Sequence, residues 1–396
     1  MDPLFLTGLS ASVVAVVIIK TVITFVFLLI ATMLMVWFER KVVSDMQNRI
    51  GPNRAGPFGI LQTLADGIKL FFKEGLLPDR ADKTIFRLAP YLSFVPAFIT
   101  FAIVPVGGVF SDGGDGTVSD LLGHTTFFQL ADPPIGILVA LACSSIAVYG
   151  VMLAGWSSGS KYPLLGSVRA SGQMISYEAA LGLSVVAVVL ASGTLSTHGI
   201  VAQQAVGLWH WNVFRLGVVP FLVFLVAATA ELERPPFDLL EAEQELVAGF
   251  NTEYAGIRFA LFYLAGFMNV ITMSALMVTL FFGGPSGPLL FGPDWIWPLV
   301  WFFAKLTVFL YVFVWFRATL PRFRYDQLMD LGWKVMIPLS LGWLLVLAAI
   351  NVGNDEGWNV SLVVVVCGVL LIAGAALLGA AMRTGAERRR VGDLEG

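Results

Sequence analysis

Hydrophobic residues along the chain gather in long runs that are separated by shorter polar segments. A helix needs about 20 apolar residues to cross the roughly 30 Å hydrocarbon core of a bilayer. The runs long enough for this lie near residues 13–38, 88–110, 134–156, 175–192, 212–229, 255–282, 297–318, 335–351 and 360–382. The pattern predicts an all-α, polytopic transmembrane bundle of about nine spans.

Composition agrees with this pattern. Of the 396 residues, 57% are hydrophobic and only 13% are charged, which is far from the composition of a soluble domain. The ten-residue alternation typical of a membrane β-barrel is missing, and so is the internal repeat typical of secondary transporters. We therefore expect one transmembrane domain over residues 1–383 and a polar cytoplasmic tail over 384–396. We expect contact with the lipid bilayer and no nucleic-acid partner.

The Lys and Arg residues are concentrated in every second segment between the predicted spans, which places them on one side of the bundle. Most of them occur in the segments 39–87, 157–174, 230–254, 317–334 and 383–390, whereas the segments 111–133, 193–211, 283–296 and 351–359 contain none. Because cytoplasmic loops are enriched in Lys and Arg, this predicts an outside N-terminus and a cytoplasmic C-terminus. That arrangement requires an odd number of spans. Residues 1–12 lack a basic signal region, so we expect the first helix to be retained.

Lys20, Glu178 and Lys305 are three of the charged residues that fall inside predicted spans. Lys20 lies near the outer end of the first span and is expected either to reach toward the interface or to face the interior. Glu178 and Lys305 lie in the fourth and seventh spans. A charge at such depth normally faces a bundle interior or a hydrated cavity, which makes both candidates for a proton relay.

The cysteines and histidines are too few and too scattered to form a redox centre. Cys143 and Cys367 stand alone in apolar runs, and His124, His198 and His210 all fall in predicted outer segments. A metal, haem or iron–sulfur ligand set cannot be assembled from them. If the chain takes part in redox chemistry, a partner subunit must carry the electrons.

The first inner segment combines a bend with an amphipathic helix. Three glycines and two prolines within residues 49–59 break any helix there. Over residues 60–73 the apolar side chains recur with a helical period, while Asp66, Lys69 and Lys73 fall on another side. Two interpretations stay open for this surface helix: an anchor in the membrane surface, or one side of an entrance for an amphipathic ligand.

The segment 231–253 places an unusual number of charges between two apolar runs. Its charged residues are Glu231, Glu233, Asp238, Glu241, Glu243, Glu245, Glu253 and Arg234. If Pro235–Pro236 opens a helix, then Asp238, Glu241 and Glu245 share one face, and their repulsion favours shared protons. The segment is interpreted either as a proton pathway or coupling device, or as a solvated acidic loop that binds a basic partner.

The segment 317–327 interleaves arginines with aromatic residues. Arg317, Arg322, Arg324 and Asp326 fall within it. One interpretation is a positive-inside stop signal. The other is a set of ion pairs that lock the inner face or dock a partner.

Seven motifs spread in order over the chain resemble one protein family. They are ERK at 39–41, MQNRIGPNR at 46–54, LADGIKL at 64–70, QMISYE at 173–178, ELERPPFDL at 231–239, EAEQELV at 241–247 and PRFRYDQLM at 321–329. The chain is thereby similar to the H subunit of bacterial NADH-quinone oxidoreductase, respiratory complex I, whose mitochondrial counterpart is called subunit 1.

The resemblance implies a non-redox subunit of the cell inner membrane that takes part in proton-translocating NADH:quinone oxidoreduction. A quinone is the implied substrate, and its implied contacts are Glu39, Arg40, Arg49, Asp66 and Lys69. The implied proton relay consists of Glu178, Glu231, Asp238, Glu241, Glu243, Glu245 and Glu253. Arg234, Arg317, Arg322, Arg324 and Asp326 remain candidates for structural ion pairs or partner docking.

The resemblance also implies where the rest of the reaction takes place. Partners are the quinone-site subunits of the peripheral arm and the antiporter-like membrane subunits, and the FMN and iron–sulfur clusters belong to partner subunits. We expect no activity from the isolated chain. Neither the kind of quinone nor the choice between proton passage and charge response follows from the sequence.

One departure from the family pattern concerns the sixth predicted span. Many relatives have an acidic residue where this chain has Gly266. A relay must bypass that point through water or a partner side chain, unless the acid is not required. Two alternatives to the quinone enzyme are the corresponding subunit of an energy-converting hydrogenase and a stand-alone proton-coupled transporter.

Overall fold

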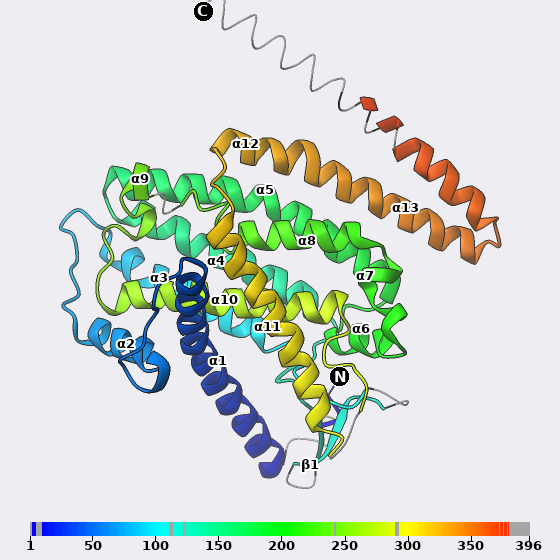
Figure 1. Ribbon diagram of the computed structural model, residues 1–396, viewed down its shortest axis with the longest axis horizontal. Helices are drawn as coiled ribbons and strands as arrows, with labels where there is room; N and C mark the ends of the chain where they lie inside the picture. Colours follow the sequence, from blue (N-terminus) through cyan, green and yellow to red (C-terminus); the bar gives the residue numbers. More distant parts are fainter. Residues whose placement is uncertain are drawn as a thin grey trace, which may run out of the picture.

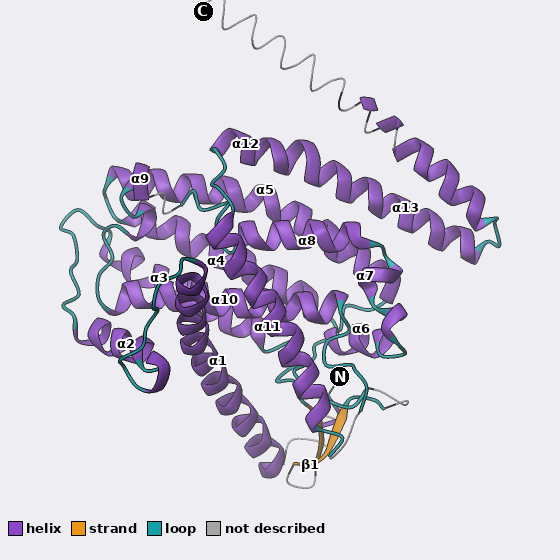
Figure 2. Cartoon of the chain, in the orientation of Figure 1, coloured by secondary structure: helices purple, strands orange, loops and turns teal. Residues whose placement is uncertain are grey.

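The computed structural model describes residues 2–4, 10–110, 114–121, 124–240, 243–289, 293–371, 373–374, 376–377 and 379. Glu241, the side chain of Glu243 and the tail 384–396 lie outside this description. Helices dominate the described residues, whose two strands form one small hairpin (Figure 2). The predicted all-α membrane class is confirmed.

Seven helices of the described chain are long and apolar enough to cross a membrane (Figure 1). They are α1 (Ala11–Met46), α3 (Lys83–Phe101), α4 (Gly136–Ser157), α5 (Lys161–Ser192), α10 (Ile257–Phe281), α11 (Ile296–Thr319) and a last helix over Tyr325–Asp355. The last helix joins α12 (Tyr325–Asp330), the π-helical η6 (Leu331–Met336) and α13 (Ile337–Asp355). Each of the seven overlaps a predicted span, although α3 ends at Phe101, well before the predicted end near residue 110.

The other two predicted spans coincide with shorter apolar helices, α8 (Val218–Glu231) and Val360–Leu371. The 14 residues of α8 rise only about 21 Å, less than the thickness of the hydrocarbon core. The predicted start near residue 212 is wrong, because Gly217, with φ +79°, separates α8 from the short α7 (Asn212–Arg215). The last residue of α8, Glu231, is buried inside the bundle.

The inner segment 157–174 also differs from the prediction. We expected a loop there, but α5 begins at Lys161 and continues without interruption to Ser192. Pro163 falls in the first turn, where the missing amide hydrogen has no partner to lose. The polar half of α5 therefore extends the bundle toward the charged end.

Short elements connect the long helices. At the charged end lie η2 (Pro57–Gly59), α2 (Gln62–Phe72), α9 (Glu243–Leu246) and η5 (Gly249–Asn251). At the opposite end lie α6 (Thr197–Gln204), η4 (Leu208–His210) and the antiparallel hairpin of β1 (Thr117–Leu121) and β2 (His124–Phe127). The hairpin pairs Thr117 with Phe127 and Val118 with Thr126.

Helix α10 forms the centre of the bundle. In its most apolar stretch 83% of the residues are buried, against 17% in α1 and 11% in the last helix. In Figure 1, α1 and α11 run obliquely across the other long helices. Their exposed apolar side chains are what a membrane protein presents to lipid or to partner subunits.

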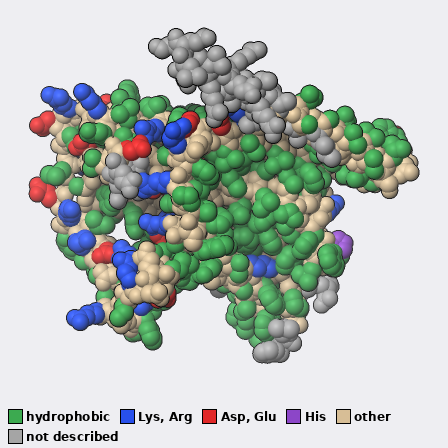
Figure 3. Space-filling model, turned by 45° about the horizontal axis from the view of Figure 1, so that its top comes forward, with side chains coloured by type: hydrophobic (Ala, Val, Ile, Leu, Met, Phe, Trp, Pro, Cys, Tyr) green, Lys and Arg blue, Asp and Glu red, His purple; other side chains and the backbone are tan. Residues whose placement is uncertain are grey.

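Charged side chains gather at one end of the molecule, beside a broad apolar surface (Figure 3). Helix α2 lies at this end, against α1 and α10. The amphipathic helix predicted over 60–73 is thus present over Gln62–Phe72. Its apolar side chains Leu64, Ile68 and Phe71 are all exposed, as expected for a helix on a membrane surface or against a partner.

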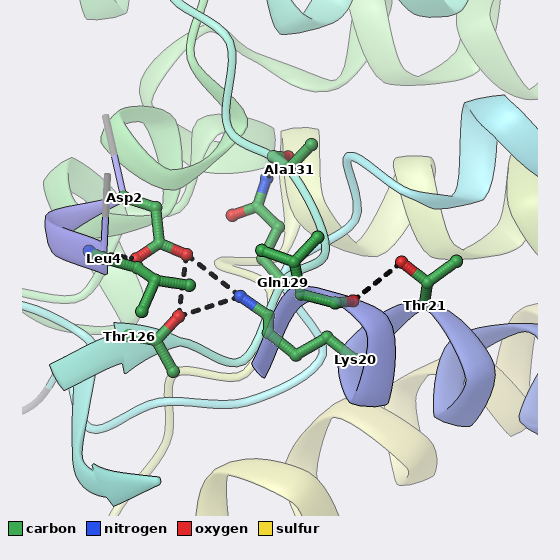
Figure 4. Close-up of polar contacts among 8 residues, drawn as sticks. Asp2, Leu4, Lys20, Thr21, Thr126, Gln129 and Ala131 are labelled. Atoms are coloured by element: carbon green, nitrogen blue, oxygen red, sulfur yellow. Dashed lines mark hydrogen bonds and ion pairs between the residues drawn. The ribbon is translucent and has the colours of Figure 1, made fainter. Parts of the chain in front are cut away.

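The side chain of Lys20 forms a buried polar contact. Its ammonium Nζ lies 2.9 Å from Asp2 Oδ2 and 2.8 Å from Thr126 Oγ1, and the Thr126 hydroxyl donates to the same Asp2 oxygen (Figure 4). The side chains of Lys20 and Asp2 are only 12% and 2% exposed. The N-terminal segment, α1 and β2 are therefore joined by a buried ion pair.

This ion pair yields a stability prediction. Lys20→Met should destabilise the chain by about 3 kcal/mol, because it leaves the buried Asp2 carboxylate unpaired. The double variant Asp2→Asn/Lys20→Met removes both charges and should recover most of the loss. The measurement is the thermal midpoint of the purified assembly. Additive losses in the double variant would show that the pair does not act as a unit.

Candidate functional site

A three-residue ion-pair cluster around the buried carboxylate of Glu39 lies at the charged end, where α1, the turn after α8 and α11 meet. Arg234 Nη1 lies 3.1 Å from both carboxylate oxygens of Glu39, and Arg317 forms a second ion pair with the same carboxylate. The Glu39 side chain is only 8% exposed. The Arg234 guanidinium also lies 4.5 Å from the centre of the Phe267 ring. The cluster ties three elements together through one carboxylate.

A chamber of about 530 Å³ opens beside this cluster. Its lining comes from the end of α1, the bend after it, α10 and α11. Among the predicted quinone contacts, Glu39, Arg40 and Arg49 line the chamber, together with the aromatic rings of Tyr263 and Phe267. A volume of this size is typical of a small-molecule site. Its lining combines apolar side chains with four charged ones, the three above and Arg317.

The other two predicted quinone contacts lie on α2. Asp66 Oδ2 accepts a hydrogen bond of 2.7 Å from Arg40 Nη1. This bond fixes the position of the Arg40 side chain, which lines the chamber. Lys69 Nζ lies 3.9 Å from Asp66 and its side chain is 70% exposed. An ion pair so exposed contributes little to stability. The structure thus places Asp66 behind the chamber wall and Lys69 on the outer surface of α2.

Two predicted relay carboxylates, those of Glu231 and Glu178, are bound by neighbouring serines of α4. Ser144 donates a hydrogen bond of 2.5 Å to Glu231 Oε1, and the adjacent Ser145 donates one to Glu178. Glu231 is 3% exposed at the end of α8, and it lies close enough to Glu178 to interact electrostatically. Sequence reasoning missed Ser144 and Ser145, since a serine in an apolar helix gives no distinctive signal.

The acidic segment does not form the helix that we predicted from Pro235–Pro236. Residues 232–240 are irregular, and α9 is a single turn over Glu243–Leu246. Asp238 pairs with Arg322 at 2.7 Å, and Glu245 pairs with Arg169 of α5 at 2.7 Å. The expectation of one repelling face is therefore wrong for these two carboxylates, because each faces a different arginine.

The remaining residues of the acidic segment are less informative. Glu253 is half-buried in the turn before α10, whereas Glu241 and the Glu243 side chain lie outside the described residues. Tyr254 anchors this turn by stacking on Phe86, with ring centres 4.0 Å apart. Burial raises the pKa of Tyr254 to about 12, so its hydroxyl stays neutral at physiological pH.

The segment between α11 and α12 packs on the turn that follows α8. The amide of Phe323 donates to the carbonyl of Pro236 at 3.0 Å, and the Phe323 ring lies 5.5 Å from that of Phe237. Arg322 adds the ion pair with Asp238, whereas Arg324 and Asp326 pair with each other at the exposed surface.

Lys305 binds the backbone that follows α10. Its ammonium donates to the carbonyls of Phe282, Gly284 and Ser286 at 2.8, 3.0 and 2.7 Å, and it lies 4.4 Å from the Trp211 ring centre. A cation there compensates the carbonyls that a helix leaves unpaired at its C-terminus.

Gly266 lies on α10 between the chamber and the buried carboxylates. A side chain added there would meet no atom within 4 Å. Glu233, which was not among the predicted relay residues, lines the same two pockets as Gly266. Its signal in the sequence was the second acid of the ELER motif.

Known proteins resemble this chain over most of its length. The family model described as NADH dehydrogenase matches residues 19–348. A Frankia alni protein, named as the H subunit of NADH-quinone oxidoreductase, is 49% identical over 391 residues, 95% of this chain and 84% of that protein. A Frankia casuarinae protein of the same name is 50% identical over 366 residues, 90% and 78% of the two chains. By sequence and by its bundle of apolar helices, the chain belongs to the NADH dehydrogenase family.

Proposed function

We propose that this chain is the membrane subunit of a proton-translocating NADH-quinone oxidoreductase that forms the quinone chamber and couples quinone reduction to proton movement. The observation that carries the proposal is the chamber of about 530 Å³ beside the buried Glu39 carboxylate and its two arginine partners, Arg234 and Arg317. The names of both relatives contain quinone, which favours this enzyme over the hydrogenase alternative.

Different residues of the chamber contact the oxygens and the ring of the quinone. The guanidinium groups of Arg40 and Arg49 donate hydrogen bonds to a quinone oxygen and stabilise the negative charge that reduction adds. Tyr263 and Phe267 supply aromatic faces for the ring. Asp66 fixes Arg40, and Lys69 lies at the outer margin of α2.

Electrostatics can carry the effect of reduction from the chamber to the relay. Two unit charges 10 Å apart interact with about 1.7 kcal/mol at an effective dielectric constant of about 20. This corresponds to slightly more than one pKa unit, or about a tenfold change in protonation. A reduced quinone attracts Arg234 and Arg317, which weakens their hold on Glu39 and alters the charge facing the acidic segment.

The proposed relay consists of Glu178, Glu231, Asp238, Glu241, Glu243, Glu245 and Glu253. Geometry supports Glu178 and Glu231 most strongly, because both are bound to hydroxyls inside the bundle. Asp238 and Glu245 are held by arginines nearer the surface. They connect the buried pair to the inner face.

The proposed membrane arrangement follows the charges. The charged end faces the cytoplasm, with the N-terminus outside and the C-terminus inside the cell. There the chamber meets the quinone-site subunits of the peripheral arm, which carry the flavin and the iron–sulfur clusters. The exposed apolar helices face lipid and the antiporter-like subunits of the inner membrane. The isolated chain has no activity on this account.

Purification tests the proposal. The chain is tagged at its C-terminus and extracted gently from native membranes, and the preparation is assayed for NADH-driven quinone reduction. Co-purifying flavin and iron–sulfur subunits, with activity blocked by a quinone-site inhibitor, are expected. A nickel–iron partner without quinone activity, or a solitary chain, would overturn the proposal.

A further inference from the structure

Two smaller pockets continue from the quinone chamber into the bundle. The first has a volume of about 130 Å³ and shares Tyr263, Phe267 and Arg317 with the chamber wall. The second, of about 70 Å³, reaches the buried carboxylate of Glu231. Shared walls place the three spaces side by side, in the order chamber, first pocket and second pocket.

Glu233 and Gly266 lie where the two smaller pockets meet. Both residues line both pockets, together with Leu232, Phe250 and Phe262. A Cβ atom added at Gly266 would have no other atom within 4 Å. The space between the two pockets is therefore open because residue 266 has no side chain. Glu233 therefore supplies a carboxylate to a passage that glycine leaves unfilled.

The second pocket contains polar groups that require a partner. The Ser93 hydroxyl oxygen is buried and has no hydrogen-bond partner among the described residues, and Ser93 is only 6% exposed. Asn269 and Glu231 line the same space. Buried hydroxyls are nearly always hydrogen-bonded, and a polar cavity holds water once its volume exceeds about 10–15 Å³. The second pocket borders a buried hydroxyl without a partner, that of Ser93, and its volume of about 70 Å³ exceeds this threshold.

We propose that water occupies the second pocket, bound to Ser93, and that Glu233 and this water together join the chamber to Glu231 past Gly266. The inference rests on the proposed function and adds a relay residue and a water site to it. One proton leaves the Glu233 carboxyl for the water while the water releases one to the Glu231 carboxylate, so charge and atoms balance. Beyond Glu231, the neighbouring residues Ser144 and Ser145 of α4 hold Glu231 and Glu178, respectively, by hydrogen bonds.

The test uses the whole complex with substitutions at both positions. Glu233→Gln keeps the shape of the side chain but removes its proton, and it should slow proton translocation about 10²-fold, the low end for a positioned proton-transfer group. Glu233→Gln/Gly266→Glu returns a carboxylate to the same passage and should recover coupling. Glu356→Gln, at an exposed position after α13, is the matched control.

The outcomes separate this inference from the proposed function. Full coupling in Glu233→Gln, or loss of coupling that Gly266→Glu does not rescue in an assembled complex, would overturn the inference. Quinone reduction by the wild-type complex would still support the proposed function. If the double variant fails to assemble, high-resolution density of the wild-type complex decides. Water within hydrogen-bond distance of Ser93 Oγ supports the inference, and a dry pocket or a partner side chain in it overturns it.

Discussion

Replacing Glu39 with glutamine is expected to slow quinone reduction by the assembled complex about a hundredfold and to lower its thermal midpoint. The Glu39 carboxylate, in a residue only 6% exposed, forms ion pairs with both Arg234 and Arg317. Removing one partner of a buried ion pair costs about 3–5 kcal/mol, because its attraction no longer offsets the desolvation of the charge that remains, here chiefly the Arg234 guanidinium, whose side chain is 14% exposed. A loss of about 3 kcal/mol at the chamber wall corresponds to that hundredfold effect.

The measurement compares two electron acceptors in the same preparation. NADH oxidation with a hydrophilic acceptor, which needs no chamber, should stay at the wild-type rate, whereas reduction of a quinone should fall. Glu74→Gln, at an exposed position of the same charged end, provides the control for charge removal. Wild-type quinone reduction together with an unchanged thermal midpoint in Glu39→Gln would contradict the prediction.

The membrane helices could be predicted because a single local property determines them. Apolar runs near 255–282 and 297–318 became α10 (Ile257–Phe281) and α11 (Ile296–Thr319) almost without change. The length of α8 could not be predicted in the same way. Its start depends on the positive φ of Gly217, and hydropathy alone does not distinguish a helix that begins before the glycine from one that begins after it.

Sequence reasoning named Arg234 and Arg317 as candidates for ion pairs, but it could not identify Glu39 as the partner that they share. Glu39, Arg234 and Arg317 each look like an ordinary charge next to a span, and they are far apart in the sequence. Only the packing of α1 and α11 around α10 brings them together at one chamber. The pairing of Lys20 with Asp2 could not be predicted for the same reason. It forms because the folded N-terminal segment lies beside α1 and β2.

The acidic segment shows how a helical assumption fails. A spacing of i, i+3 and i+7 places side chains on one face only if the backbone is helical throughout. Pro235 and Pro236 lack amide hydrogens, and residues 232–240 take an irregular course that sends Asp238 to Arg322 and Glu245 to Arg169. The arginines sit on α5 and after α11, so tertiary pairing replaces the expected repulsion.

The second large effect is expected for Glu231→Gln. The amide is nearly isosteric with the carboxylate and still accepts the hydrogen bond from Ser144, so the complex should assemble. It cannot exchange a proton, and Glu231 lies between the second pocket and Glu178. We therefore expect proton translocation to slow about 10²-fold, as for the loss of a positioned proton-transfer group.

Inverted membrane vesicles separate this effect from loss of the enzyme. Acidification of the vesicle interior is followed together with NADH oxidation, and the amount of assembled complex is measured in the same membranes. Glu356→Gln, which alters a carboxylate at an exposed position outside the bundle, should leave both rates unchanged. A wild-type ratio of protons to electrons in Glu231→Gln would show that no proton passes this carboxylate, and coupling would then have to act through charge alone.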